Sequence, residues 1–200
     1  GAGTVGQFAA SAALALGVSV KVFDNSLFKL RRLQNEIGQK VFTSVIQPKV
    51  LEKALMRCDV AIGALSAPHG RTPCIVSEDV VKKMKSGSVI VDVSIDKGGC
   101  FETSKITTHQ NPTFTKHDVI HYCVPNIGSR VSRTASFSLS NIFSPLLIEI
   151  SESGGCEKLI QYSKGFRHGV YIYNGILTSS ILGKAFNIPY KNLDLLISAL

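Results

Sequence analysis

The sequence has few charged residues, no long hydrophobic run and no repeated or low-complexity stretch. Charged side chains make up 18% of the 200 residues and hydrophobic ones 44%, yet no apolar segment reaches the length of a membrane-spanning helix. A membrane partner is therefore not expected. The apolar content is enough for one full core, or for one domain and part of another.

Cysteine is present without any paired pattern. The five cysteines are odd in number and scattered, and the sequence contains no C-x-x-C. Such usage indicates a reduced, cytoplasmic compartment. A secretory signal is also missing, although a chain that begins inside a domain would lack one in any case.

Basic residues outnumber acidic ones by 22 to 14, which gives a formal net charge of +8. Their densest groups, at 29–33 and 82–85, fall within amphipathic helical patterns. Solvated helix faces explain these groups better than a phosphate-binding patch does, so nucleic acid is not an expected partner. A basic chain also suits a small anionic ligand.

Helical and extended patterns alternate through the first 125 residues. Helical stretches end in glycine or begin with proline or serine, and extended stretches are rich in β-branched residues. This alternation predicts βαβ units in an α/β fold, with a doubly wound parallel sheet of the Rossmann type. The expected helices cover residues 4–17, 26–38, 48–58 and 77–87, and the expected strands cover 18–23, 40–45, 59–64, 88–95 and 119–124.

The alternation stops after about residue 130. Residues 134–155 read as one helix that contains Pro145, and residues 175–200 read as two more helices. We therefore expect a Rossmann domain over residues 1–130, and over residues 131–200 a helical segment that belongs to a second domain.

The chain opens with "GAGTVG", which has the G-x-G-x-x-G spacing of a dinucleotide-binding loop. In such a loop Gly1 permits a tight turn, Gly3 lets the backbone approach a diphosphate, and Gly6 lets helix and strand pack closely. Asp24 ends an extended stretch 18 residues after Gly6 and can accept hydrogen bonds from both ribose hydroxyls. Its charge would repel a 2′-phosphate, so the pattern predicts NAD rather than NADP.

The same motif normally follows a β-strand, and none precedes it here. That strand is the central one of a dinucleotide-binding sheet. We therefore expect the first strand to lie upstream of residue 1, in a longer protein of which this chain is a C-terminal part.

Three further stretches carry a resemblance to a known family. They are "MKSGSVIVDVSIDKGGCFETS" (84–104), "TTHQNPTF" (107–114) and "HYCVPNIGSRVSRTASFSLSN" (121–141). Together with "GAGTVG" and residues 58–84, they closely resemble the C-terminal part of bacterial alanine dehydrogenases, in the alanine dehydrogenase/transhydrogenase α-subunit family. The resemblance covers most of the chain in the right order.

The resemblance implies a Rossmann domain inserted into a substrate domain, to which the C-terminal helices return. It implies reversible oxidative deamination of L-alanine to pyruvate and ammonium with NAD, commonly in a homohexamer. A soluble transhydrogenase subunit and a non-catalytic NAD-sensing module stay open as alternatives. The transhydrogenase subunit normally lacks the aspartate of "SIDKGG" and the "HYCVPN" pattern, so this chain follows the alanine dehydrogenase side.

The resemblance also implies two groups of cofactor-binding residues beyond the glycines and Asp24. The group along the diphosphate and the riboses is Thr4, Val5, Lys29, Leu65, Ser66 and Lys105. The group around the nicotinamide is Val93, Ser94, Ile95, Asp96, Val124, Pro125, Asn126 and Ile127. The family's catalytic histidine and its substrate-binding arginine and lysine come from the N-terminal domain, so none of the five histidines here is assigned to catalysis.

Asp96 is the residue expected to act in catalysis. It stands at the carboxyl end of an apolar stretch, followed by Gly98 and Gly99, and ligands of open α/β sheets bind outside such strand ends. With the family match, it is expected to hydrogen-bond the substrate amine or the attacking water and to balance charge beside the nicotinamide. A turn-forming aspartate is the alternative. Asn126 likewise either positions substrate or nicotinamide, or is a structural loop amide.

Other reactive side chains carry no site prediction. His117 and His121 are four residues apart but flank the start of a strand and lack a third ligand, so no metal is expected. Cys100 and Cys123 lie near the expected site without a partner base, and we expect them to be packing residues.

The chain departs from the family pattern in three places. The loop "LSAPHG" (65–70) replaces a more apolar one, Lys97 stands where glutamine is usual, and "PNIGS" (125–129) stands where "ANMP" is common. These departures concern loop details rather than the implied reaction.

Overall fold

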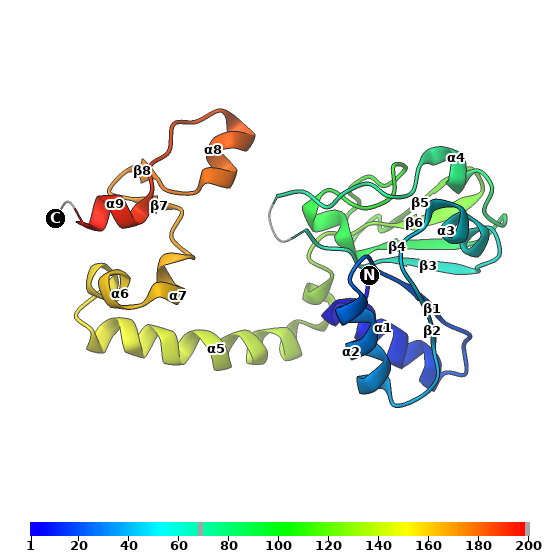
Figure 1. Ribbon diagram of the computed structural model, residues 1–200, viewed down its shortest axis with the longest axis horizontal. Coiled ribbons are helices and arrows are strands. Elements are labelled where there is room, and N and C mark those ends of the chain that lie inside the picture. Colours follow the sequence, from blue (N-terminus) through cyan, green and yellow to red (C-terminus); the bar gives the residue numbers. More distant parts are fainter. Residues whose placement is uncertain (68–69, 199–200) are drawn as a thin grey trace. The chain divides into compact units, whose positions relative to one another are not determined.

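The computed structural model describes residues 1–67 and 70–198. The chain folds into two compact units, Gly1–Ile127 and Gly128–Leu200, which Figure 1 colours from blue to green and from yellow-green to red. Each unit is described by itself below. Within the described residues, no helix is both long enough and apolar enough to cross a membrane.

The N-terminal unit contains a parallel pair of strands and a four-stranded sheet (Figure 1). β1 (Lys21–Phe23) pairs in parallel with β2 (Phe42–Ser44). The larger sheet has the order β3-β4-β6-β5, in which β3 (Val60–Gly63), β4 (Val89–Asp92) and β6 (Val119–Tyr122) are parallel. The expected α/β architecture with parallel strands is confirmed, and each strand is shorter than expected.

An edge strand corrects the expectation of an all-parallel sheet. β5 (Thr113–Lys116) runs antiparallel to β6 and pairs Lys116 with Val119. The two residues between these strands, His117 and Asp118, have φ values of 54° and 59°. Positive φ at both central residues is typical of a tight type I′ hairpin turn. Because the turn lacks the usual Asn-Gly or Asp-Gly pair, the sequence did not reveal the hairpin.

The parallel strands do not form one continuous sheet in the described part of the chain. Among the described residues, β1 pairs with β2, and β3 pairs with β4. The central strand that is expected upstream of residue 1 stays a prediction.

Two hydrophobic cores hold the helices of this unit to the strands. α1 (Thr4–Ala15) and α2 (Leu27–Ile37) pack with β1 in one core, and α3 (Pro48–Leu55) and α4 (Glu78–Val81) pack with β3, β4 and β6 in the other. The first core contains Ala2, Ala10, Val22, Leu30, Leu33 and Val41. The second contains Leu51, Leu55, Ala61, Val76, Val81, Met84, Ile90, Cys100, Phe101 and Val119.

The helix expected over residues 77–87 is wrong beyond Val81. The amides of Lys83 and Met84 each donate to a carbonyl three residues back, so the chain tightens into 3₁₀-type turns. Gly87 then adopts a φ of 78° and donates its amide to the Asp118 carbonyl at 2.7 Å. This bond turns the chain into β4 and leaves no room for a longer α-helix.

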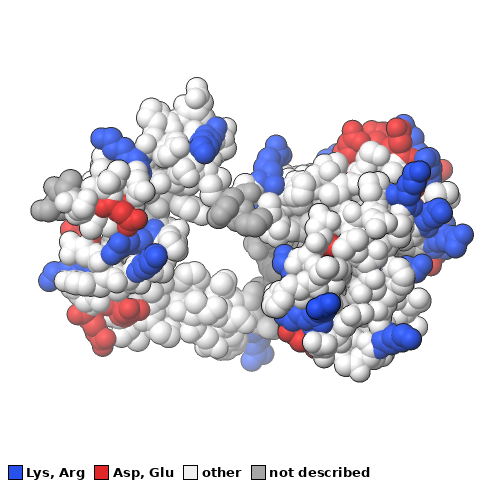
Figure 2. All heavy atoms as spheres, viewed as in Figure 1, with Lys and Arg blue, Asp and Glu red and all other residues white. Residues whose placement is uncertain are grey.

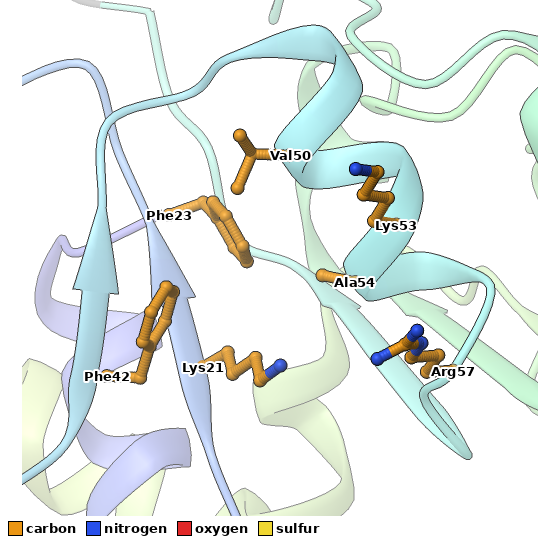
Figure 3. A pocket seen from close by; sticks show the side chains of 7 residues that line it. All are labelled: Lys21, Phe23, Phe42, Val50, Lys53, Ala54 and Arg57. Atoms are coloured by element: carbon orange, nitrogen blue, oxygen red, sulfur yellow. The ribbon is translucent and has the colours of Figure 1, made fainter.

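A hollow of about 330 Å³ lies between the β1–β2 pair and α3. Figure 3 shows Lys21, Phe23 and Phe42 on the strand side, with residues of α3 opposite them. The α3 side and the residue just after it contribute Val50, Lys53, Ala54 and Arg57. Lys21 begins β1, so the hollow extends toward the amino ends of the strands, whereas ligands of open α/β sheets bind at the carboxyl ends.

The basic residues at 82–85 lie on a solvated surface. Lys82 pairs with Asp79 at 2.9 Å, and Lys83 pairs with Glu52 at 2.6 Å, both pairs being exposed. Figure 2 shows the Lys and Arg side chains of the visible face in separate groups with uncharged surface between them. This distribution fits the interpretation of solvated faces rather than one continuous basic surface.

The C-terminal unit is mainly helical. α5 (Ser132–Glu152) matches the expected long helix and contains Pro145. A hairpin of β7 (Ile172–Tyr173) and β8 (Ile176–Leu177) was not expected, although its turn residues Asn174 and Gly175 both have positive φ. The remaining elements are the 3₁₀ turn η2 (Ile127–Val131), α6 (Cys156–Tyr162), α7 (Lys164–Arg167), α8 (Ser180–Phe186) and α9 (Leu193–Ser198).

His121 is a buried, fully bonded side chain of β6. Its Nδ1 lies 2.9 Å from the Val119 carbonyl, and its Nε2 lies 2.8 Å from the Thr103 hydroxyl. Its ring stacks on Phe114 with the ring centres 4.7 Å apart. Burial lowers the pKa of His121, so the folded chain favours the neutral imidazole.

Lowering the pH should reduce the free energy of unfolding through His121. The unfolded chain takes up a proton at the ordinary pKa of 6.5, before the folded chain does. Stability is thus lost as the pH falls from that value toward the folded pKa, by at most about 1.4 kcal/mol per pH unit. Urea unfolding between pH 5 and 8 should show a shallower dependence for His121→Gln. The matched variant His168→Gln is the control, and equal slopes for both variants would contradict the prediction.

Candidate active site

The glycine loop closes tightly against the end of β3. A Cβ atom on Gly6 would overlap the carbonyl of Gly1, and one on Gly1 would overlap the carbonyl of Ala64. A Cβ atom on Gly3 would meet nothing within 4 Å. Gly1 and Gly6 are therefore required for backbone packing, whereas Gly3 borders open space at the start of α1.

Asp24 anchors this loop at the end of β1. Its carboxylate is buried and accepts hydrogen bonds from the amides of Ala2 and Ser26, both at 2.8 Å. Ser26 in turn caps α2 by accepting from the amide of Lys29. The expected ribose-binding residue thus also holds the start of the glycine loop and the start of α2.

Asp92 plays a similar part at the end of β4, and the sequence analysis did not single it out. Its side chain is 1% exposed. Oδ1 accepts from the Ser94 amide at 3.0 Å, and Oδ2 accepts from the Cys100 amide at 2.9 Å and the Ser104 hydroxyl at 2.7 Å. The Phe101 amide lies 3.4 Å from Oδ2. The donors of a whole loop therefore converge on one carboxylate.

This loop corrects the strand expected over residues 88–95. β4 ends at Asp92, and η1 (Val93–Lys97) follows as a 3₁₀ turn. The Asp92 side chain caps that turn through the Ser94 amide. Asp96 therefore stands on η1 rather than on the strand, and its side chain is exposed.

Three loops are joined at the carboxyl edge of the sheet. The Ser94 hydroxyl donates to the Leu65 carbonyl at 2.8 Å, which ties η1 to the loop after β3. Asp96 Oδ1 accepts from the Asn126 amide at 2.7 Å, which ties η1 to the loop after β6. The Asn126 contact uses the backbone, at a φ of 52°. The structure thus brings together residues that the sequence analysis expected around the nicotinamide.

Lys97 makes a further contact between η1 and the loop after β3. Its ammonium donates to the Ser66 hydroxyl at 3.0 Å and lies 3.4 Å from the Ala67 carbonyl. Ser66 and Lys97 both belong to the stretches that depart from the family pattern, and they contact each other. Pro68 and His69 of the same loop lie outside the described residues.

The other expected cofactor residues vary in exposure. Thr4 and Val5 form the exposed first turn of α1, whereas Val124 is buried two residues after the end of β6. Lys105 lies with its ammonium 4.4 Å from the centre of the Phe114 ring. Its described contact is thus with β5, and not with the three joined loops. The partly buried residues of the set are Lys29, Val93, Pro125 and Ile127, and Ile95 is buried.

The thiols of Cys100 and Cys123 are buried and unreactive. Burial, followed by the negative charge of Asp92, raises the pKa of Cys100 to about 12, and burial raises the pKa of Cys123. Both thiols stay protonated near neutral pH, so neither has the thiolate form that nucleophilic chemistry requires.

His117 and His121 do not share a site. His117 contacts Glu78 at 2.6 Å, whereas both nitrogens of His121 are bonded inside the unit. In residues 1–67 and 70–198, no group of three or more His, Cys, Asp or Glu side chains is arranged to hold a metal ion.

Comparison with known proteins decides the family. The sequence profile described as "Alanine dehydrogenase/PNT, C-terminal domain" matches residues 1–180. The chain belongs to this family. The C-terminal domain of the alanine dehydrogenase/PNT family is its NAD-binding domain.

Individual relatives agree with this assignment. The chain is 37% identical to alanine dehydrogenase of Mycolicibacterium smegmatis over 192 residues, or 96% of this chain and 52% of that protein. It is 38% identical to alanine dehydrogenase of Halomonas elongata over 190 residues, or 95% of this chain and 51% of that protein. A solved L-alanine dehydrogenase matches with a TM-score of 0.85 and 33% identity, covering 94% of this chain and 51% of that one. The chain therefore spans about half the length of these relatives.

The two tight glycines of this family's loop should differ from Gly3 in what they tolerate. Gly6→Ala should lower the free energy of unfolding by about 1–3 kcal/mol, because the new Cβ meets the backbone of Gly1. Gly3→Ala is the matched control and should change stability by less than about 1 kcal/mol, since its Cβ enters open space. Urea unfolding of both variants measures the difference, and equal losses would contradict it.

Proposed function

We propose that this chain is the NAD-binding part of an enzyme that reversibly oxidises L-alanine to pyruvate and ammonium. The single observation that carries the proposal is the carboxyl edge of the sheet, where η1 presents the exposed Asp96 between the loops after β3 and β6. Family membership and the similarity to alanine dehydrogenases support it. By resemblance, the assembly is proposed to be a cytoplasmic homohexamer.

The residues around the glycine loop fit a dinucleotide. In the residues that the structure describes, no side chain caps the first turn of α1, which leaves its amides available to an anion. The open space beside Gly3 adjoins these amides. We assign the diphosphate to this place, with Thr4 and Val5 beneath it and Asp24 on the adenosine ribose. Leu65 and Ser66 would then line the nicotinamide ribose, and the joined loops would hold the nicotinamide.

Asp96 is assigned the charge-balancing role in the reaction. The chemistry that NAD supplies when bound is acceptance of a hydride from alanine Cα. Loss of that hydride from alanine with a neutral amine leaves an iminium cation. Water adds to the same carbon and gives up a proton, and the carbinolamine then loses ammonia, which leaves pyruvate. A carboxylate fixed by the Asn126 amide can stabilise the cation and orient the water without first reorganising.

Asp96→Asn keeps the side chain's shape and removes its charge. In the full-length enzyme we expect kcat for alanine oxidation to fall at least about 10²-fold, equivalent to roughly 2.7 kcal/mol of barrier. NADH affinity, measured by fluorescence titration, should change far less. Asp59→Asn removes a charge from an exposed ion pair with Lys85 and is the matched control. Near-normal kcat would make Asp96 a turn residue, and lost NADH binding with normal kcat at saturation would make it a cofactor ligand only.

Asp24 should set the preference for NAD over NADP. Asp24→Asn keeps one oxygen for a backbone amide and removes the charge that repels a 2′-phosphate. The ratio of kcat/KM for NAD to that for NADP should shrink by about 5- to 150-fold, or roughly 1–3 kcal/mol. Thermal unfolding must be followed in parallel, because Asp24 also holds Ala2 and Ser26. Equal use of both cofactors by the unmutated enzyme would overturn the assignment.

A nicotinamide transhydrogenase subunit is the alternative that the shared family profile keeps open. The two activities differ in one direct measurement. Formation of NADH that depends on added L-alanine supports the dehydrogenase. Hydride transfer between two nicotinamide cofactors without alanine supports the alternative.

A further inference from the structure

Asp92 is a buried acidic side chain, and no ion pair to it is found in the part of the chain that the structure describes. The ion pairs of the described residues all involve other carboxylates. Both of its oxygens accept hydrogen bonds, from backbone amides and from the Ser104 hydroxyl. An aspartate carboxylate offers only acceptors in its ionised form, so a buried one needs donors at both oxygens. Such a charge is stable in a buried place only while its donors remain in position.

The donors of Asp92 bracket the segment that carries Asp96. Ser94 lies two residues before Asp96, and Cys100 lies four residues after it. Because the Asp92 carboxylate accepts from the amides of both, it closes residues 92–100 into a loop. Gly63 and Gly99 allow this closure, because a Cβ atom on either would come within 2.8 Å of an Asp92 oxygen. Asp92 therefore holds the buried side of η1, together with the backbone bonds within the turn and the bond from the Thr72 amide to the Lys97 carbonyl at 2.8 Å.

Further contacts join η1 to separate loops, among them the bond from the Lys97 ammonium to the Ser66 hydroxyl. Ser94 ties η1 to the Leu65 carbonyl, and Asp96 itself accepts from the Asn126 amide. Both of these bonds depend on η1 being in place, since each partner lies on a separate loop. The position of the Asp96 carboxylate thus depends on the buried carboxylate of Asp92.

We infer that Asp92 is the positioning residue for Asp96. It holds η1 in the 3₁₀ turn that presents the Asp96 carboxylate toward the substrate, and it does not itself touch substrate or cofactor. The expected effect on kcat rests on the proposed function. The expected effect on the conformation of η1 rests only on contacts within this chain. The two effects can be measured separately.

The kinetic test is a double-mutant cycle in the full-length enzyme. Asp92→Asn replaces one accepting oxygen with an NH₂ group that faces the loop's own donors. We expect kcat for alanine oxidation to fall about 10- to 100-fold, with NADH affinity changed less than about 3-fold. In the Asp96→Asn background the same change should cost less than about 3-fold, because Asp92 acts through Asp96. Equal losses in both backgrounds would overturn the inference.

A matched control separates positioning from general loss of stability. Val81→Ala removes two fully buried methyl groups from α4 in the same unit, and Val81 is not among the hydrogen-bond partners given above for η1 and Asp92. It should lower the melting temperature while leaving kcat per NADH-binding site within about 2-fold. If Asp92→Asn lowers the melting temperature similarly and also leaves kcat per site unchanged, its role is structural only and the inference is wrong.

Hydrogen exchange provides a test that does not require turnover. Peptides covering residues 93–101 of Asp92→Asn should exchange at least about 10-fold faster than in the unmutated protein, and α5 peptides should be unchanged. Unchanged exchange over 93–101 would overturn the inference. If the unmutated enzyme fails to oxidise alanine, the proposed function fails, whereas this exchange result still decides the role of Asp92.

A second variant is needed in case Asp92→Asn does not fold. Ser104→Ala removes a single donor to Oδ2 and keeps the buried charge. We expect Ser104→Ala to lower kcat about 3- to 10-fold, a smaller effect than that of Asp92→Asn. In the Asp96→Asn background, Ser104→Ala should lower kcat very little. Normal kcat together with normal exchange over residues 93–101 in this variant would overturn the inference.

Discussion

The carboxyl edge of the sheet depends on aspartates whose side chains accept hydrogen bonds from backbone amides where a strand ends. Asp24 follows β1 and Asp92 ends β4, and each accepts from the amide two residues on, at Ser26 and Ser94. The second oxygen of each then reaches an amide far along the chain, at Ala2 in one case and at Cys100 in the other. Each carboxylate therefore makes an Asx turn and pins a distant loop. The same arrangement, one aspartate that accepts from two backbone amides, therefore positions both the glycine loop and η1.

The Asx turns at Asp24 and Asp92 explain why β1 and β4 end where they do. A β-strand continues only while its amides find ladder partners, and a short acidic side chain offers the next amide a competing acceptor. At Asp92 the competition ends β4 and starts η1, although Val93, Ser94 and Ile95 would suit a strand. The turn then carries Asp96 out of the sheet and into an exposed position. Without the early stop, alternating residues would have pointed to opposite faces of the sheet.

The sequence predicted the order of helices and strands well, because that order depends on local patterns. Gly38 ends α2 in the left-handed conformation, and Pro48 begins α3, as the patterns indicated. The antiparallel β5 was missed because its turn at His117 and Asp118 has no local signal. The hairpin at Asn174 and Gly175 had such a signal, but its strands are only two residues long.

The residues of the candidate site were predictable only where a known sequence pattern marks them. Asp24 and Asp96 were predicted from a fingerprint and a family pattern and stay predictions, whereas Asp92 reads as one residue of an apolar strand. The sequence D-x-S occurs at both strand ends, as "DNS" (24–26) and "DVS" (92–94), and is the signal that would have found Asp92. Its long-range donors at Cys100 and Ser104 could not be foreseen, because they depend on how the glycines fold the loop back.

Asp92 and Asp96 differ in one respect that determines what each can do. The buried carboxylate of Asp92 has its lone pairs occupied by the protein, so it can organise a loop but has little capacity left for a substrate. The exposed carboxylate of Asp96 accepts one backbone amide and keeps accepting capacity for a cation or a water molecule. Electrostatic catalysis needs a charge that is both available and already fixed in place. A single surface aspartate would be available but mobile, and a single buried one would be fixed but unavailable. The proposed division of roles, with Asp92 at the end of β4 and Asp96 four residues later on η1, meets both requirements.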